Sequence, residues 1–360
     1  GRLRLFPTEN FPDGIDVAAP LMNDMLDMLR VYAPDVLERS LPILEKEGIL
    51  VQAKERYEMG RWTVPEALLQ PKVFDDGSVD IIQQSEHYVI VSKPPVLVVH
   101  DSSWTPRWKE NLPMLQRVRD ETGRRVNLVH RLDRGASGCL LFAFSETRED
   151  EGGKKVPCGV TKSLIESMQH PEATKTYFAL CDGDGSWNGV NYLDKGWFTF
   201  DNPVKDENDK LIENATTEFC FAASTILPPI DDNGGASTEA DDGNLEARKI
   251  SIVLARPKSG RWHQIRQHLS SGKIGHAILG DSSHGRSRTN RLWKRKRHLM
   301  KERVCLHLSR VRLPATAEYS PDGIDATCPL PSDLMKLLKA LPHELLDEAR
   351  PVLAKEGIII

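Results

Sequence analysis

The fold of this chain is decided by the stretch Val129-His130-Arg131-Leu132-Asp133-Arg134-Gly135-Ala136-Ser137-Gly138-Cys139-Leu140-Leu141-Phe142-Ala143-Phe144. Glycine and serine punctuate its polar first half, and its second half is a continuous apolar run, which predicts a buried strand behind a functional loop. The loop places the carboxylate of Asp133 between Arg131 and Arg134, and a carboxylate beside arginines stays ionised. Taken alone, such a loop is most often a surface turn with a local ion pair.

The composition is that of a globular protein of 360 residues, enough for one large domain or two modest ones. No apolar run approaches membrane-spanning length, so we expect no membrane partner. Six scattered cysteines without a C-x-x-C pair predict neither a zinc site nor a disulfide framework, and they favour an intracellular, reducing compartment. The formal net charge of -4 argues against a wholly basic nucleic-acid binder, so any nucleic-acid contact has to come from a local patch.

A segment of roughly forty residues occurs near both ends of the chain. Pro12-Asp13-Gly14-Ile15-Asp16 returns as Pro321-Asp322-Gly323-Ile324-Asp325, and Lys46-Glu47-Gly48 returns as Lys355-Glu356-Gly357. The later copy reads as the cap of the core that precedes it. The earlier copy, residues 1–51, reads as a remnant of an upstream module that takes no part in chemistry.

Both copies carry further matching features. Arg2-Leu3-Arg4-Leu5 is echoed by Arg310-Val311-Arg312-Leu313. Each copy then has three apolar residues on one helical face, which predicts an amphipathic helix: Leu21, Met25 and Leu29 in the first, and Leu330, Leu334 and Leu338 in the second. Pro342 and Pro351 predict that the end of the chain is divided into short helical pieces.

Between the two copies, residues 80–338 read as one folded core. Residues 52–79 form a charged connector. Residues 228–246 are acidic and rich in small side chains, and are most simply a disordered insertion. Residues 339–360 read as a carboxy-terminal helical extension.

Within the core, alternating and apolar runs predict strands. They are His87–Ser92 and Leu97–His100 around a Lys-Pro-Pro turn, Thr174–Leu180, Ile250–Ala255 and Val304–Leu308. Trp262–Leu269 predicts a short helix. His263 and His268 within it lack the glutamate of the H-E-x-x-H motif, which argues against a zinc protease, and we expect no metal site.

Several of these motifs resemble those of the RluA-type pseudouridine synthases, in the family's order and across residues 80 to 338. His-Arg-Leu-Asp followed by Ser-Gly at 130–138 resembles the active-site motif, and the Lys-x-Tyr strand resembles another. Gly-Arg-x-His-Gln-Ile-Arg-x-His-Leu at 260–269 is similar to the third motif. The form Gly-Asp-Ser-x-His-Gly at 280–285, with His284 where most members have tyrosine and Asn290-Arg291 after it, is similar to the bacterial tRNA pseudouridine synthase C branch. Val96 stands where the family usually has glycine.

The resemblance implies a mixed α+β fold with a mainly antiparallel central sheet, flanked by helices and crossed by an RNA cleft. It implies conversion of uridine to pseudouridine without a cofactor, by a monomeric enzyme. The substrate it favours is the T-arm of tRNA near the acceptor stem, with ribosomal RNA as the alternative. A reading of another class is a catalytically dead RNA-binding protein on the same scaffold.

The resemblance also implies roles for individual residues. Asp133 would be the catalytic carboxylate, Tyr177 would lie against the target base, and Arg266 would pair with Asp133. Whether Asp133 attacks C1′, attacks C6 or acts as a base stays open. The expected RNA-contacting side chains are His130, Arg131, Arg134 and His263, together with Lys294, Arg295 and Arg297 from a basic run that could equally be a solvated helix face.

Overall fold

The structure, a computed structural model, describes residues 2–5, 15–18, 77–100, 112–149, 155–228, 248–316, 318–358 and 360. They belong to two units, one made of residues 1–76 and 102–110 and the other of residues 77–101 and 111–360. The predicted helix of the first repeat copy, the connector up to residue 76 and the insertion from residue 229 lie outside the described residues. No helix of the described residues is long and apolar enough to cross a membrane.

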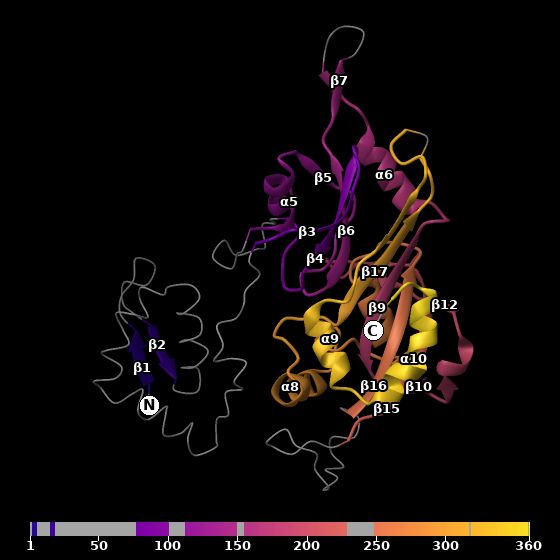
Figure 1. The fold of residues 1–360 in the computed structure, drawn as a ribbon. Helices are drawn as coiled ribbons and strands as arrows, with labels where there is room; N and C mark the ends of the chain where they lie inside the picture. Colours follow the sequence, from indigo (N-terminus) through magenta and orange to yellow (C-terminus); the bar gives the residue numbers. More distant parts are fainter. Residues whose placement is uncertain are drawn as a thin grey trace. The chain divides into compact units, whose positions relative to one another are not determined.

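The second unit is organised around a ten-stranded sheet with the order β12-β15-β16-β9-β17-β6-β4-β3, in which β18 also pairs with β17 and β5 with β6 (Figure 1). Its strands are β3 (Asp80–Gln84), β4 (Tyr88–Lys93), β5 (Val126–Leu128), β6 (Ser137–Phe144), β9 (Thr174–Asp182), β12 (Phe198–Asp201), β15 (Thr216–Ile226), β16 (Lys249–Pro257), β17 (Leu306–Leu313) and β18 (Ile324–Thr327). Among its pairings, only β17 with β6 is parallel. The predicted α+β class with a mainly antiparallel sheet is therefore confirmed.

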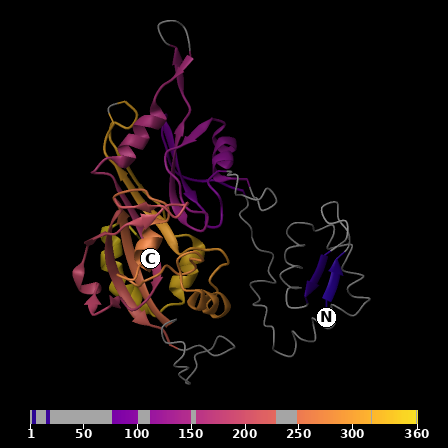
Figure 2. The ribbon, with the colours of Figure 1, turned by 180° about the vertical axis from the view of Figure 1, so that it is seen from behind.

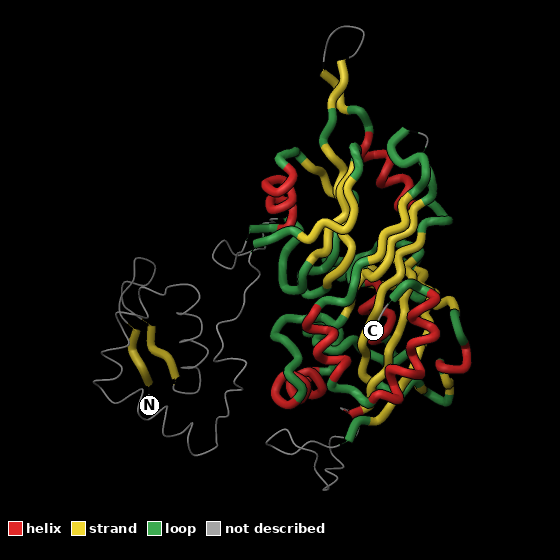
Figure 3. Tube along the Cα trace, viewed as in Figure 1, coloured by secondary structure: helices red, strands yellow, loops and turns green. Residues whose placement is uncertain are grey.

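Helices surround this sheet (Figure 3). They are α5 (Met114–Thr122), α6 (Val160–Gln169), α7 (Gln264–Ser270), α8 (Ser287–Lys296), α9 (Ser332–Lys339) and α10 (His343–Lys355). Smaller two-stranded ribbons join β7 (Thr147–Glu149) to β8 (Lys155–Pro157), β10 (Ser186–Trp187) to β11 (Val190–Asn191), and β13 (Val204–Lys205) to β14 (Leu211–Ile212). Helices α9 and α10 lie toward the viewer in Figure 1 and behind the strands in Figure 2, so they cover one face of the sheet.

The apolar run of residues 137–144 forms β6, and every residue of it is buried. It is hidden because β17 and β4 pair with its two edges and β5 pairs with its end. A strand covered on both sides needs apolar side chains on both faces, which is why the sequence does not alternate there. The strand behind the loop of Asp133 is thus the buried centre of this half of the sheet.

Helix α10 corrects the expectation that proline would divide the end of the chain. Pro351 lies inside α10 rather than at its boundary. An interior proline removes one helical hydrogen bond and costs about 3 kcal/mol. The apolar face of α10, with Leu346, Ala349 and Leu353 buried in the same core cluster as β15, offsets this cost.

The predicted strand at Leu97–His100 is wrong. The carbonyl groups of Val98 and Val99 accept the N–H groups at the start of α5, at 3.0 and 2.9 Å, and the carbonyl of Leu97 accepts from Nζ of Lys93 at 2.7 Å. These acceptors therefore satisfy a helix terminus and a buried lysine instead of a neighbouring strand.

Val96, in the turn before this segment, adopts a left-handed conformation with φ of 62°. This region favours glycine, and a β-branched residue there is a steric outlier. The departure from the family's usual glycine thus falls on a residue whose backbone conformation suits glycine.

The described residues of the first unit repeat a hairpin of the second. Strand β1 (Arg2–Leu5) pairs antiparallel with β2 (Ile15–Ala18), with Arg2 opposite Ala18 and Leu5 opposite Ile15. In the second unit β17 pairs with β18 in the same way, with Arg310 opposite Thr327 and Leu313 opposite Ile324. The repeated sequence is therefore accompanied by the same strand register.

Candidate active site

The loop that carries Asp133 connects β5 to β6 and closes as a turn, since the N–H of Ala136 donates to the carbonyl of Asp133 at 3.0 Å. Gly138 follows, with φ of 122°, and a Cβ atom there would lie 2.3 Å from the carbonyl oxygen of Leu308 on β17. Only glycine allows this approach. The Ser-Gly of the motif therefore lets β6 lie beside β17 directly after the loop.

Two fully buried cations hold the same loop by its carbonyl groups. Nζ of Lys93 donates to the carbonyl of Arg134 at 3.2 Å, and Nη1 of Arg303 donates to that of Gly135 at 2.9 Å. Nε of Arg303 donates to Asp333 on α9 at 2.7 Å. A buried charge requires such partners, so these contacts make the loop part of the core rather than a free surface turn.

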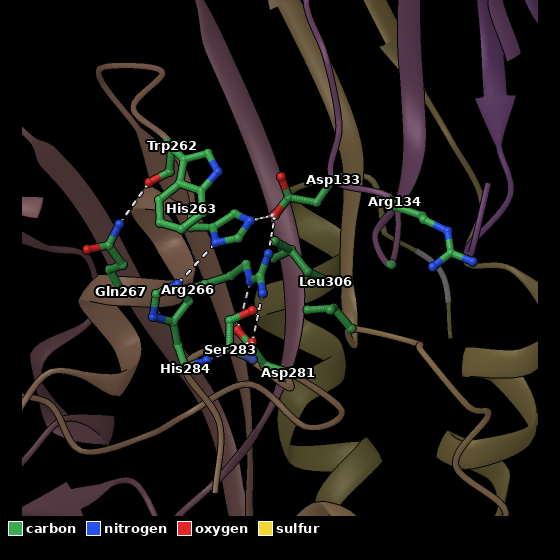
Figure 4. A network of polar contacts seen from close by, with 12 residues as sticks. Asp133, Arg134, Trp262, His263, Arg266, Gln267, Asp281, Ser283, His284 and Leu306 are labelled. Carbon is green, nitrogen blue, oxygen red and sulfur yellow. Dashed lines mark hydrogen bonds and ion pairs between the residues drawn. The ribbon is translucent and has the colours of Figure 1, made fainter. Parts of the chain in front are cut away.

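Arg266 on α7 lies between two carboxylates (Figure 4). Its Nη1 donates to Oδ2 of Asp133 at 2.8 Å, so the predicted contact between these residues is present. Its Nε and Nη2 donate to the two carboxylate oxygens of Asp281 at 2.7 Å each. The Asp133 side chain is 28% exposed, whereas those of Arg266 and Asp281 are 6% and 1% exposed. One carboxylate therefore remains accessible while the pair behind it is buried.

Electrostatics fix the charges of the buried pair. Burial raises the pKa of Asp281, but the hydrogen bonds and charge of Arg266 outweigh it and leave the pKa below its usual value. Burial lowers the pKa of Arg266, but Asp281 and then Asp133 raise it above its usual value. Asp281 also accepts the backbone N–H groups of Ser283 and His284 at 2.9 Å. The guanidinium that faces Asp133 is consequently held in one orientation.

Two histidines extend the network away from Asp133. Nε2 of His263 lies 3.7 Å from Oδ2 of Asp133, and its Nδ1 shares a hydrogen bond of 3.0 Å with Nε2 of His284. Burial lowers the pKa of His263 to about 4 and also lowers the pKa of His284. Both rings are therefore neutral at pH 7, so one nitrogen of the shared bond donates and the other accepts. Trp262 stacks on His263, with ring centroids 3.8 Å apart.

Tyr177 reaches the site through the sheet. It lies on β9 opposite Leu308 of β17, and Leu308 lies opposite Gly138 at the start of β6. Burial and then the charge of Asp133 raise the pKa of the Tyr177 hydroxyl. The phenol is therefore protonated at neutral pH, and it is close enough to Asp133 to feel that charge.

Comparisons with known proteins agree with this arrangement. The family model described as RNA pseudouridylate synthase matches residues 87–271, a range that includes Asp133, Tyr177 and Arg266. The chain belongs to this family. The assignment of individual roles to these three residues stays a prediction.

Two curated relatives illustrate how much of this synthase is matched. It is 33% identical to tRNA pseudouridine synthase C of Pectobacterium carotovorum subsp. carotovorum over 69% of this chain and 58% of that protein. It is 34% identical to tRNA pseudouridine synthase C of Yersinia pestis over 67% of this chain and 83% of that protein. Among solved structures, human RNA pseudouridylate synthase domain containing 4 is similar, with a TM-score of 0.47, 17% identity, and coverage of 75% of this chain and 93% of that one.

The structure places the predicted RNA-contacting residues of the synthase loop in different environments. Arg131 is exposed. Arg134 is paired with Glu302 at 2.7 Å rather than with Asp133. Nε2 of His130 accepts the backbone N–H of Leu141 at 3.1 Å, and burial lowers its pKa to about 4. His130 is thus tied to β6, and Arg131 is the loop cation that faces solvent.

The basic run is also divided by the structure. Arg295 is exposed and Lys294 is half-buried on α8. Arg297 donates from Nη2 to the carbonyl of Pro228 at 3.0 Å, and burial and the charge of Arg248 lower its pKa to about 10. Trp293 is only 1% exposed, which corrects the idea that it is interleaved for RNA contact, because its place is in the core.

Sequence reasoning missed how the residues behind Asp133 are supported. Asp281 was visible only as part of a loop motif. Asn290 marked a branch of the family, but its side chain is buried and braces this loop by accepting from the N–H of Gly280 at 2.8 Å and donating to the carbonyl of Asp281 at 2.7 Å. Arg303 had no signal beyond being one more cation in a basic run. Among the residues that the structure describes, no group of three or more His, Cys, Asp or Glu could hold a metal ion.

Proposed function

We propose that this synthase converts uridine to pseudouridine in tRNA, in the T-arm near the acceptor stem. The observation that carries the proposal is the Asp133–Arg266 ion pair, with its carboxylate accessible and its guanidinium buried, in a chain of the RNA pseudouridylate synthase family. The tRNA substrate is supported by the similarity to two proteins named tRNA pseudouridine synthase C. Ribosomal RNA is the alternative substrate.

The reaction requires little beyond what these side chains offer. The N1–C1′ bond of uridine breaks and a C5–C1′ bond forms, while C5 loses a proton and N1 gains one, so atoms and charge balance. Asp133 would supply the carboxylate that attacks C1′, attacks C6 or acts as a base. Arg266 would orient it in each case, because two of the three bonded guanidinium nitrogens are held by Asp281.

The target base has to leave the RNA stack before it reaches a partly buried carboxylate. Tyr177 would offer a flat ring for the uracil and a protonated hydroxyl close to Asp133. Arg131, exposed at the start of the same loop, would occupy the place that the base leaves. We expect the enzyme to act as a monomer.

The test is chemical mapping of pseudouridine after incubation of the purified chain with unmodified tRNA and, at matched salt, with ribosomal RNA fragments. Asp133→Asn preserves shape and removes the charge, so it should abolish turnover and leave RNA binding nearly intact. Turnover by this variant above background would refute the role of Asp133. Binding without any turnover by the wild type would support the reading as an inactive RNA-binding protein.

A further inference from the structure

Trp262 is an exposed aromatic ring next to the site. The large apolar side chains that are exposed among the described residues are Ile81, Leu112, Leu211, Ile226, Trp262 and Met300. Trp262 is the aromatic member of this set, with 37% of its surface exposed. A single exposed apolar residue needs no explanation by itself, so its surroundings decide its meaning.

The indole of Trp262 is held in place. It stacks on His263 with an interplanar angle of 19°, and His284 meets it edge-on at 5.9 Å. Nε2 of Gln267 donates to the carbonyl of Trp262 at 2.9 Å, which fixes the backbone (Figure 4). A ring that is already fixed loses little conformational entropy when a ligand stacks on it.

The position of this ring relates it to the reacting carboxylate. His263, on which Trp262 stacks, lies 3.7 Å from Asp133. Arg261, the residue before Trp262, is exposed, and its Nε donates to the carbonyl of Asn214 at 3.3 Å. A flat aromatic face followed by a cation is the combination that binds single-stranded nucleic acid, because bases stack on the ring and phosphates pair with the charge.

We propose that Trp262 stacks a nucleobase of the substrate RNA that is a neighbour, in the strand, of the uridine to be modified. The inference rests on the proposed function and extends it to a second nucleotide. Flipping the uridine removes the stacking partner of its neighbours. The uracil itself has to reach Asp133 and Tyr177, so the indole is left for a flanking base and replaces the stacking that this base has lost.

The test is a double-mutant cycle measured by RNA binding. The RNA is a tRNA arm that contains the target uridine, intact or with an abasic site at each flanking position in turn. For the wild type, loss of the stacked base should weaken binding about five- to 150-fold. Trp262→Leu should weaken binding of intact RNA by a similar factor and show no further loss with the abasic RNA. Trp262→Phe, which keeps a flat ring, should restore most of the affinity.

Additive losses at every flanking position, or unchanged affinity of Trp262→Leu, would overturn the inference. A second measurement needs no variant: 2-aminopurine at the stacked position should lose fluorescence on binding to the wild type, and no change at any flanking position would also overturn it. The outcome is separate from that of the proposed function. Pseudouridine formation with additive losses refutes the stacking alone, whereas a complete cycle without pseudouridine formation refutes the enzymatic activity alone.

Discussion

Asp281 binds Arg266 through more hydrogen bonds than Asp133 does. Two nitrogens of the guanidinium donate to Asp281 at 2.7 Å each, and a single nitrogen donates to Asp133 at 2.8 Å. A bidentate arginine–carboxylate pair fixes the plane of the guanidinium. Asp281 therefore sets the direction from which Arg266 approaches the reacting carboxylate.

Asp281→Asn should lower kcat more than it changes KM, by roughly ten- to a hundredfold, because it loosens Arg266 without touching the RNA surface. Breaking one partner of a buried ion pair should also reduce the free energy of unfolding by roughly 3–5 kcal/mol. Steady-state kinetics and urea unfolding measure the two effects. Asp325→Asn is the control, because its pair with Arg310 is largely exposed and its loss should cost about 1 kcal/mol or less. An unchanged kcat for Asp281→Asn would contradict the positioning role.

Neutralising the exposed part of the basic helix should weaken binding to all RNAs alike. Replacing Lys294 and Arg295 with glutamine should flatten the dependence of affinity on salt by about two phosphate contacts, with little change in turnover at saturating RNA. Arg297→Gln is the comparison, since it is half-buried against the carbonyl of Pro228 and should lower stability instead. An unchanged salt slope for the double variant would leave α8 as a solvated surface.

Val96→Gly should stabilise the protein. A valine in the left-handed region costs roughly 1–2 kcal/mol that glycine does not, and the greater freedom of glycine in the unfolded chain offsets only part of this gain. The melting temperature should rise by about 2–4 °C. Val96→Ala is the matched control, because it retains Cβ and should gain much less. A lower melting temperature for Val96→Gly would mean that packing of the valine side chain outweighs the backbone strain.

His130 should make stability depend on pH. Its pKa is lowered from 6.5 to about 4, so the unfolded chain binds a proton at this site before the folded chain does. The contribution of His130 is therefore complete above about pH 6.5 and is lost as the pH falls toward 4. His130→Gln, which can still accept the N–H of Leu141, should show a smaller fall in the free energy of unfolding between pH 7 and pH 5. An equal fall in both proteins would argue against this assignment.

Deleting residues 1–60 should leave turnover on tRNA within a few-fold of the full chain. The segment matches the chain's own carboxy-terminal cap and contains no counterpart of Asp133, Tyr177 or Arg266. The assay is pseudouridine formation at several RNA concentrations, with circular dichroism to confirm folding. A folded deletion variant that has lost activity would show that the amino-terminal copy helps to bind the substrate.

Local pattern was sufficient for the central strand and for the order of the motifs. Residues 137–144 are apolar throughout, and such a run is stable only where both of its faces are covered, which predicts its central position. The segment Leu97–His100 shows where local pattern fails. It has the composition of a strand, yet its carbonyl groups are engaged by α5 and Lys93, which the local sequence does not reveal.

The sequence by itself determined the family, the mixed fold and the expectation that Arg266 meets Asp133. Only the tertiary structure decided that Asp281 orients Arg266, that His284 reaches His263, and that Arg303 holds the loop across 168 positions of the chain. The physical reason is that a buried charge or polar ring takes its partner from whichever element folds against it. Such partners leave no periodic pattern along the sequence, whereas the burial of a strand does.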